Sequence, residues 1–175
     1  MLATKLLEKQ HRKVEEIFSK LEHGGPDVEE LVTELANDLA AHMTIEQEIF
    51  YPAIQDVDRK QVFESYEEHA LAEFALKRLI AADPASDEFQ ARVTALKELI
   101  EHHVKEEEKE LFPEVEKALD EEKLKELGAQ MQEQFDKVVK AGFDSAVPRG
   151  FAKTSSDVSK KVLKKPHGGS RKKAA

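Results

Sequence analysis

Apolar residues recur every three or four positions along most of the first 144 residues, which is the pattern of helices that bury one face. Five segments carry this pattern. We predict helices at residues 3–22, 27–50, 59–81, 86–112 and 121–141. Helix stop signals separate them, at Gly24-Gly25-Pro26, Pro52, Asp83-Pro84 and Pro113. The sequence therefore predicts an all-α protein, a four-helix bundle with an accessory helix after it.

Several polar residues fall inside the apolar stripes, which face the core of a bundle. They are His11, His42, Glu46, His69, Glu73, His103 and Glu107. A buried carboxylate is costly unless it is paired, protonated or bound to a metal. The stripes hold almost no Lys or Arg at the same level. We therefore expect metal ions to supply the missing positive charge, and take these seven residues as candidate metal ligands.

Two of the predicted helices carry the same His-x-x-x-Glu motif, at residues 42–46 and 103–107. Residues four apart project from the same helix face, so each pair can reach one site. Each motif has a proline ten residues after its histidine, and a further histidine in the preceding helix, His11 or His69. The chain therefore reads as a duplicated helix hairpin whose halves point these groups at one central site.

The chemistry of the candidate ligands narrows the choice of metal. Cysteine is absent, so the donors are imidazole nitrogen and carboxylate oxygen, which suit Fe, Mn, Zn or Ni. Six or seven ligands are too many for one tetrahedral zinc ion, whereas two ions that share carboxylates use that number. Ferritin-like bundles take Glu-x-x-His from two helices. That spacing occurs once, at Glu8 and His11, and Glu8 lies off the stripe.

The order of these motifs resembles the hemerythrin-like family, which is built on the hemerythrin HHE cation-binding domain. The resemblance covers about residues 1–120, and includes the Phe-Tyr-Pro and Leu-Phe-Pro sequences after the two motifs. It implies an up-down-up-down bundle around two iron ions, an oxo- or hydroxo-bridged di-iron centre. It also implies that Glu46 and Glu107 bridge the ions and that the four histidines are terminal ligands.

Two positions depart from the oxygen-carrying members of that family. The carriers have a fifth histidine where this chain has Glu73, and an Asp five residues after the last histidine where this chain has Glu107 four residues after. At both positions the chain resembles the bacterial and regulatory members of the family rather than the oxygen carriers. An anionic Glu73 ligand would favour ferric iron, so we expect slow or absent reversible oxygen carriage.

The resemblance leaves several functions open. The first is a metal-binding protein that binds or senses oxygen, nitric oxide or peroxide at an open iron position, in an oxygen or oxidative and nitrosative stress response. The alternatives are iron storage or homeostasis, an enzyme that disproportionates peroxide or reduces nitric oxide, and a metal-free structural bundle. An enzyme needs a proton donor near the metal, for which the sequence offers tyrosines and Glu73.

Residues outside the ligand set are expected to have structural roles. We predict that His102 lies on the surface, because it projects about 100° around the helix from His103. Glu108 is expected at the surface or beside the ligands. Tyr51, Tyr66 and Phe112 are expected to pack in the core, with a pocket over the metal as the alternative role.

The charge divides the chain into parts. The net charge is −9, but residues 145–175 hold nine Lys or Arg and one Asp. We predict domains at 1–120, the metal-binding bundle, 121–144, the accessory helix, and 145–175, a disordered basic tail. The tail is expected to solubilise the protein, with nucleic acid or an anionic surface as the alternative partner. No apolar run is long enough to span a membrane, and we expect a cytoplasmic protein.

Overall fold

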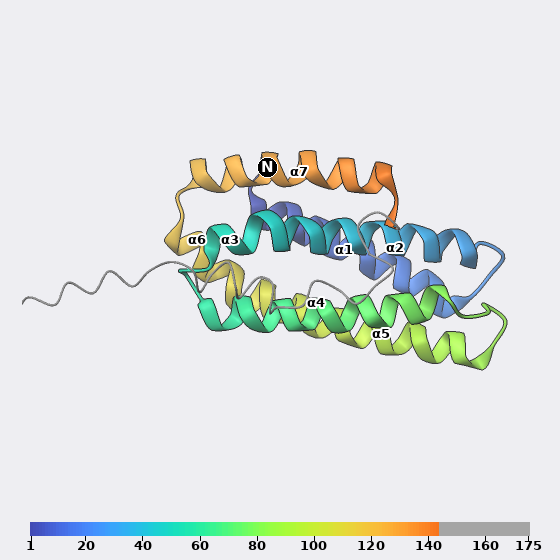
Figure 1. Cartoon of the computed structure of the whole chain (residues 1–175). Helices are drawn as coiled ribbons and strands as arrows, with labels where there is room; N and C mark the ends of the chain where they lie inside the picture. Colours follow the sequence, from blue (N-terminus) through green and yellow to red (C-terminus); the bar gives the residue numbers. More distant parts are fainter. Residues whose placement is uncertain (144–175) are drawn as a thin grey trace, which may run out of the picture.

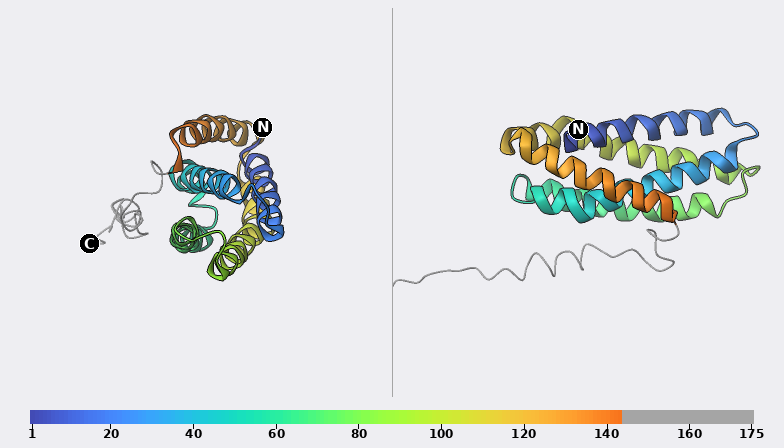
Figure 2. Two further views of the ribbon diagram at one scale, coloured as in Figure 1. Left: turned by 90° about the vertical axis from the view of Figure 1, so that its right-hand side faces the viewer. Right: turned by 90° about the horizontal axis from the view of Figure 1, so that it is seen from above.

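The computed structural model describes residues 1–143. In this part of the chain four long helical rods lie lengthwise against one another, and one further helix covers the outside of two of them (Figures 1 and 2). The first rod is α1 (Ala3–His23) and the third is α4 (Arg59–Ile80). The outer helix is α7 (Glu121–Ala141). The predicted all-α four-helix bundle with an accessory helix is confirmed.

The second and fourth rods are each built from three consecutive pieces, with one turn of π-helix in the middle. The second rod comprises α2 (Val28–Ile45), η1 (Glu46–Phe50) and α3 (Tyr51–Ile54). The fourth rod comprises α5 (Asp87–Glu106), η2 (Glu107–Leu111) and α6 (Phe112–Ala118). The two rods therefore repeat one design, which agrees with the duplicated hairpin in the sequence.

Side-chain caps define where three of the helices begin. Asp58 accepts a hydrogen bond from the backbone N–H of Gln61 (3.0 Å), and Asp120 accepts one from Lys123 (2.8 Å). The hydroxyl of Ser86 accepts one from the N–H of Phe89 (3.2 Å). These bonds satisfy N–H groups that have no partner inside the helix. The short polar residues between the apolar segments are therefore the start signals of α4, α5 and α7.

Pro52 and Pro113 do not end their rods, although the sequence predicted a helix end or a kink at Pro52 and a helix end at Pro113. Each lies at the start of a further helical piece, α3 or α6, directly after the π turn. In that turn the N–H of the preceding residue bonds five residues back, from Tyr51 to the carbonyl of Glu46 in the first case. Since the hydrogen-bond register has already shifted there, a residue without an N–H is tolerated and the rod continues.

The apolar core is divided into two clusters that lie on either side of the polar residues in the stripes. One cluster contains Val14, Leu39 and Ile100, and the other contains Leu7 and Leu111. His11 comes between Leu7 and Val14 along α1, and the other three histidines, Glu46 and Glu107 are placed in the same way, whereas Glu73 lies beside one cluster alone. The core thus forms an apolar layer above and below a polar band.

The outer helix α7 belongs to one of these clusters. Leu124, Leu127 and Met131 are buried and share the cluster that contains Ile45 of α2. α7 therefore covers the α1–α2 side of the bundle, while α4 and α5 lie on the other side (Figure 2).

Two further sequence predictions concern membrane-spanning segments and the C-terminal tail. No helix within residues 1–143 combines the length and the apolar composition that crossing a membrane requires. The predicted disordered basic tail, 145–175, lies outside the described residues.

The contact of α7 with the start of the chain predicts a destabilising substitution. A Cβ at Gly128 would collide with the carbonyl oxygen of Met1 and lie 3.0 Å from the backbone nitrogen of Ala3. Helix propensity favours alanine over glycine by about 0.5–1 kcal/mol, whereas forced overpacking costs about 1–3 kcal/mol. We expect Gly128→Ala to lower the melting temperature in thermal unfolding followed by circular dichroism. Gln130→Ala, at an exposed position of the same helix, is the control, and a Gly128→Ala protein that melts higher would contradict the close contact.

Candidate metal centre

The polar band between the two apolar clusters is made of side chains from all four rods. His11 comes from α1, His42 from α2, His69 from α4 and His103 from α5, and all four are at most 5 % exposed. Glu46 and Glu107 are the first residues of the π turns η1 and η2, and both are fully buried. π turns are rare and occur frequently at functional sites. The duplicated sequence thus delivers two matching sets of ligands to one level of the bundle.

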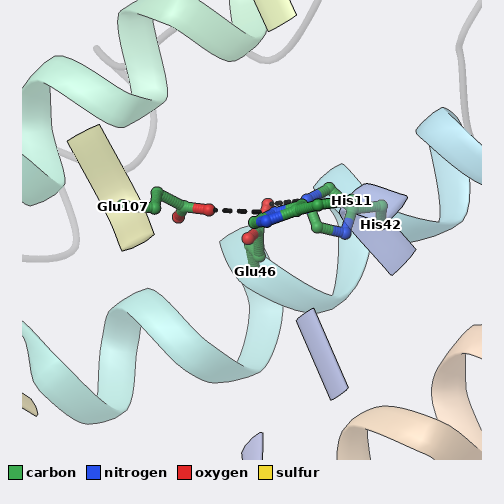
Figure 3. A group of neighbouring side chains, drawn as sticks. All are labelled: His11, His42, Glu46 and Glu107. Carbon is green, nitrogen blue, oxygen red and sulfur yellow. Dashed lines mark ion pairs between the residues drawn. The ribbon is translucent and has the colours of Figure 1, made fainter. Parts of the chain in front are cut away.

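The ligand atoms form two groups that share one residue. His11, His42, Glu46 and Glu107 make one group (Figure 3), and Glu46, His69 and His103 make the other. In each group the ligand atoms lie within 4.8 Å of one another. Each helix hairpin therefore brings its own two histidines together.

Both carboxylates reach across from one hairpin to the other. Oε2 of Glu46 lies 3.1 Å from Nε2 of His42 and 3.2 Å from Nε2 of His69. Oε2 of Glu107 lies 3.3 Å from Nε2 of His11 and 3.7 Å from Nε2 of His103. Each carboxylate thus contacts one histidine of each pair, which is the arrangement needed to bridge two metal ions.

Several of these atoms are buried without a hydrogen-bond partner. In the described part of the chain they include Nε2 of His11, both carboxylate oxygens of Glu46 and Oε2 of Glu107. Buried polar atoms in folded proteins nearly always have partners, and a buried charge without one is strongly destabilising. All four atoms point into the same small volume between nitrogen and oxygen donors. A pair of metal ions at this position would satisfy them together, so the residues present fit the metal that the motif implies.

Burial and mutual repulsion control the pKa values of the two carboxyl groups. Burial, followed by the charge of Glu107, raises the pKa of Glu46 well above its usual range. Burial also acts to raise the pKa of Glu107, but the nearby His103 and His11 outweigh it and lower that pKa. In the absence of metal the centre therefore holds its negative charge on Glu107, and Glu46 resists ionisation.

The histidines divide in a corresponding way. Burial lowers the pKa of His42 and of His69 well below the usual value, which keeps both rings neutral. Burial acts in the same direction on His11, but the nearby carboxylate of Glu107 and the hydrogen bond with Glu108 together raise its pKa. A neutral imidazole is the form that binds metal. Two of the four rings are therefore ready to coordinate, and His11 must release the charge that pairs it with the glutamates.

Each histidine also has a partner on its outward-facing nitrogen, Nδ1, and these partners follow the repeat. The residue before the first histidine of each hairpin supports the second histidine: Gln10 Oε1 lies 2.8 Å from His42, and Glu68 Oε2 lies 2.7 Å from His103. The residue after Glu46 or Glu107 supports the first histidine of the other hairpin. These contacts join Glu108 Oε1 to His11 (2.8 Å) and the amide of Gln47 to His69 (3.1 Å).

These outer partners fix the orientation of the rings. For His11, His42 and His103 the partner is an oxygen, so Nδ1 can donate its N–H and leave Nε2 free for a metal, whereas Nδ1 of His69 faces the amide nitrogen of Gln47. Each histidine pair receives one glutamate and one glutamine as partners, so the outer partners give the two pairs the same charge. Sequence reasoning assigned no such role to Gln10, Gln47 or Glu68, and placed Glu108 at the surface or beside the ligands. The sequence repeat could have revealed these partners. Position 10 is equivalent to position 68, position 47 is equivalent to position 108, and all four hold polar residues.

One residue breaks the equivalence of the two halves. The hydroxyl of Tyr51, which is fully buried, donates a hydrogen bond to Oε1 of Glu107 (2.9 Å) and lies 3.3 Å from Nε2 of His69. The equivalent residue in the other half is Phe112, whose ring stacks on His11 with centroids 6.0 Å apart. Burial, then the charges of Glu107 and Glu46, raise the pKa of Tyr51 well above its usual value, so it keeps its proton. A hydroxyl donor is therefore present at the His69–His103 side of the centre.

The seventh candidate, Glu73, lies outside both groups of ligand atoms. Its Oε1 pairs with Nζ of Lys77 at 2.7 Å, one helical turn further along α4. A coordinating role for Glu73 stays a prediction, and in this structure its charge is balanced by the lysine.

A small cavity adjoins the four histidines on the side away from the π turns. Apart from His11, His42, His69 and His103, its walls are apolar, formed by Val14, Leu39, Met43, Ile100 and Val104. The pocket over the metal that the sequence allowed is thus lined by aliphatic side chains, while Tyr51 and Phe112 lie in the opposite apolar cluster.

The unusual electrostatics of Glu46 predict a substitution whose effect changes sign with metal. Without metal, Glu46→Gln removes a buried carboxyl from beside Glu107, so we expect the metal-free variant to be more stable by on the order of 1–2 kcal/mol at neutral pH. With metal, the variant loses a shared ligand and should bind less metal and melt lower. Thermal unfolding with and without a chelator measures both effects.

The same variant carries a pH dependence and a matched control. The pKa of Glu46 is raised in the folded state, so the wild-type chain is stabilised as pH falls and the folded carboxyl takes up its proton first. The advantage of metal-free Glu46→Gln should therefore shrink below neutral pH. Glu73→Gln should leave metal content unchanged; loss of metal from that variant would show that Glu73 is a ligand after all.

Comparison with known proteins agrees with this geometry. Residues 2–115 match the family described as the hemerythrin HHE cation-binding domain. The chain is 30 % identical over 105 residues to a DNA nickase from Nostoc sp. strain PCC 7120, a match that covers 58 % of this chain and 30 % of that protein. The chain thus spans about a third of the length of this curated relative.

A solved structure shares the fold. It is a hemerythrin HHE cation-binding domain-containing protein from Mycobacterium kansasii, with a TM-score of 0.72, 22 % sequence identity, and coverage of 81 % of this chain and 89 % of that chain. The histidines and glutamates that converge in the core stand within the matched residues 2–115. This chain belongs to the hemerythrin HHE cation-binding domain family and is a metal-binding, hemerythrin-like protein.

Proposed function

We propose that this protein holds two iron ions in its core and binds a small ligand, which is oxygen, nitric oxide or peroxide, at an open position beside them. The proposed ligands of the iron are His11, His42, Glu46, His69, His103 and Glu107. Two overlapping groups of donors that share Glu46 support a pair of ions rather than one. The all-nitrogen-and-oxygen donor set suits iron, and family membership supports the same choice.

Iron bound there would supply a redox-active centre with exchangeable positions. The chain contributes the surroundings. Its two apolar clusters exclude water from the centre, the outer partners hold the four imidazole rings in place, and Glu46 and Glu107 neutralise the cations. We infer a role in sensing oxygen or oxidative and nitrosative stress, in the cytoplasm.

The observation that carries the choice of ligand is the cavity against the four histidines. Its aliphatic walls offer no hydrogen bonds or charges, so a small uncharged molecule can enter at little cost, while an ion would lose its hydration without compensation. Storage of iron in bulk does not fit this enclosed space.

Two measurements on the purified protein test this function. Elemental analysis should find about two irons per chain, and the optical spectrum should show oxo-to-iron charge-transfer bands in the near ultraviolet. One zinc ion per chain, or no metal, would contradict the proposal.

A matched pair of variants tests the cavity. Val104→Leu adds a methylene to the cavity wall, whereas Val93→Leu adds the same group elsewhere in the same apolar cluster. With iron content unchanged, Val104→Leu should slow the binding of nitric oxide to the reduced protein in stopped-flow experiments, and Val93→Leu should not. Equal rates in both variants would show that the ligand takes another route.

The hydroxyl of Tyr51 favours a second candidate, an enzyme that disproportionates hydrogen peroxide. Such chemistry needs a proton donor at the metal, and this hydroxyl lies among Glu107, His69 and His103. Tyr51→Phe removes the donor and introduces the residue that the other half of the repeat has at the equivalent position, Phe112. If the protein is such an enzyme, this variant should keep its iron and lose most of its peroxide turnover, measured as oxygen release. Full turnover in Tyr51→Phe would rule out this use of the tyrosine.

The activity in the name of the Nostoc relative is not proposed for this chain. The match covers 30 % of that protein, and the nicking of DNA can reside in the remainder. A partnership of the basic residues 145–175 with nucleic acid stays a prediction from their charge.

A further inference from the structure

A second group of metal-ligand side chains lies on the outer surface of the α4–α5 hairpin. Nε2 of His102 lies 3.5 Å from Oε1 of Glu68 and 3.3 Å from Oε1 of Glu106. The ligand atoms of these three residues lie within 4.8 Å of one another. We refer to Glu68, His102 and Glu106 as the outer site.

The outer site is held by two rigid helices and is open to solvent on one side. His102 and Glu106 are four residues apart on α5 and share a face, while Glu68 projects from α4. The side chain of His102 is 61 % exposed, whereas those of Glu68 and Glu106 are 22 % and 31 % exposed. A cation could therefore reach the site from water and still meet two carboxylates that are largely shielded from it.

Further contacts hold the carboxylate of Glu68 and the backbone of Glu106 in position. The second oxygen of Glu68, Oε2, lies 2.7 Å from Nδ1 of His103, so the carboxylate cannot turn away without breaking that contact. The backbone carbonyl of Glu106 accepts a hydrogen bond from Nε2 of Gln61 (3.2 Å), which ties the end of α5 to α4. The donors are thus arranged before any cation arrives.

The charge of the outer site is not balanced by neighbouring cations. Within residues 1–143, no Lys or Arg forms an ion pair with Glu68 or Glu106. Lys60 is near Glu106, but it pairs with Glu64 at 3.1 Å. Among the described residues, the ion pairs of these two carboxylates are with the imidazoles of His102 and His103 alone, and the group attracts a further positive charge.

The other half of the repeat has no equivalent group. The positions that correspond to Glu68, His102 and Glu106 are Gln10, Ala41 and Ile45, all of which are buried. Ile45 belongs to the apolar cluster that α7 completes. The three ligand residues thus occur on the face that α7 leaves open.

We propose that the outer site is a third metal site, which binds a divalent first-row transition metal such as Zn²⁺ from solvent. One imidazole and two carboxylates are a donor set that these metals accept, and three protein donors leave positions for water. Such a site exchanges its metal readily. Because Glu68 contacts both His102 and His103, the outer metal lies one side chain away from the buried centre.

A zinc titration of the full-length, untagged protein, with its buried centre filled as purified, tests the outer site. Calorimetry should show one zinc ion bound per wild-type chain that His102→Ala binds roughly 10- to 100-fold more weakly. Glu106→Gln should weaken the same event. The control is His23→Ala, which removes an exposed histidine at the end of α1 and should behave like the wild type. The difference between His102→Ala and wild type depends on no assumption about the metal in the core.

The iron content of the variants separates this proposal from the proposed function. His102→Ala and Glu106→Gln leave the buried ligands intact, so both should contain as much iron as the wild type. Identical zinc binding by wild type and His102→Ala would overturn the outer site, whatever the core contains. Absence of iron from all of these proteins would overturn the di-iron proposal and leave the zinc result to stand by itself.

Discussion

Two carboxylates, Glu46 and Glu107, face each other in the dry core of a helical bundle, and the rest of the structure is arranged around that charge. Neither is reached by solvent, and within residues 1–143 three of their four oxygens have no hydrogen-bond partner. Without metal, the repulsion between the two buried carboxylates is reduced in two ways. The pKa of Glu46 is raised, and Glu107 pairs with histidines. The proposed pair of metal ions would neutralise both carboxylates. Metal binding and folding stability are thereby coupled through the same atoms.

The symmetry of the repeat explains how one chain builds two overlapping groups of candidate metal ligands. Each hairpin gives two histidines, and each π turn begins with the glutamate that reaches the other hairpin. The outer partners repeat as well, with glutamine in the first half where the second half has glutamate. Because the two halves share one backbone design, their differences come from individual side chains and from α7. Tyr51 in place of a second phenylalanine gives a hydroxyl to the His69–His103 side, and α7 covers one hairpin and leaves the other open.

The two π turns connect this symmetry with the position of the ligands. An α-helix with one extra residue in a turn rotates the residues that follow, and in each rod the extra residue falls directly after the histidine-to-glutamate turn. The glutamate therefore remains on the histidine face, while the aromatic residue that follows is brought back toward the core. Tyr51 and Phe112 lie below the metal ligands for this reason, and the prolines after them are accommodated in rods that continue.

The sequence predicted the helices and most of the candidate metal ligands, because helical periodicity and i, i+4 spacing are local properties. The stripes predicted the helices, and the His-x-x-x-Glu pairs with the two further histidines selected six residues that converge in the structure. The tertiary fold decided what local patterns do not contain. The prolines were interpreted as helix ends or a kink, because hydrophobic periodicity does not reveal a π turn. Glu73 shares a stripe with His69 but pairs with Lys77 in the structure. Other features depend on contacts between helices, and the packing of the helices determines those distances. They are the roles of Gln10, Gln47 and Glu68, the position of the Tyr51 hydroxyl, and the contact of His102 with Glu68.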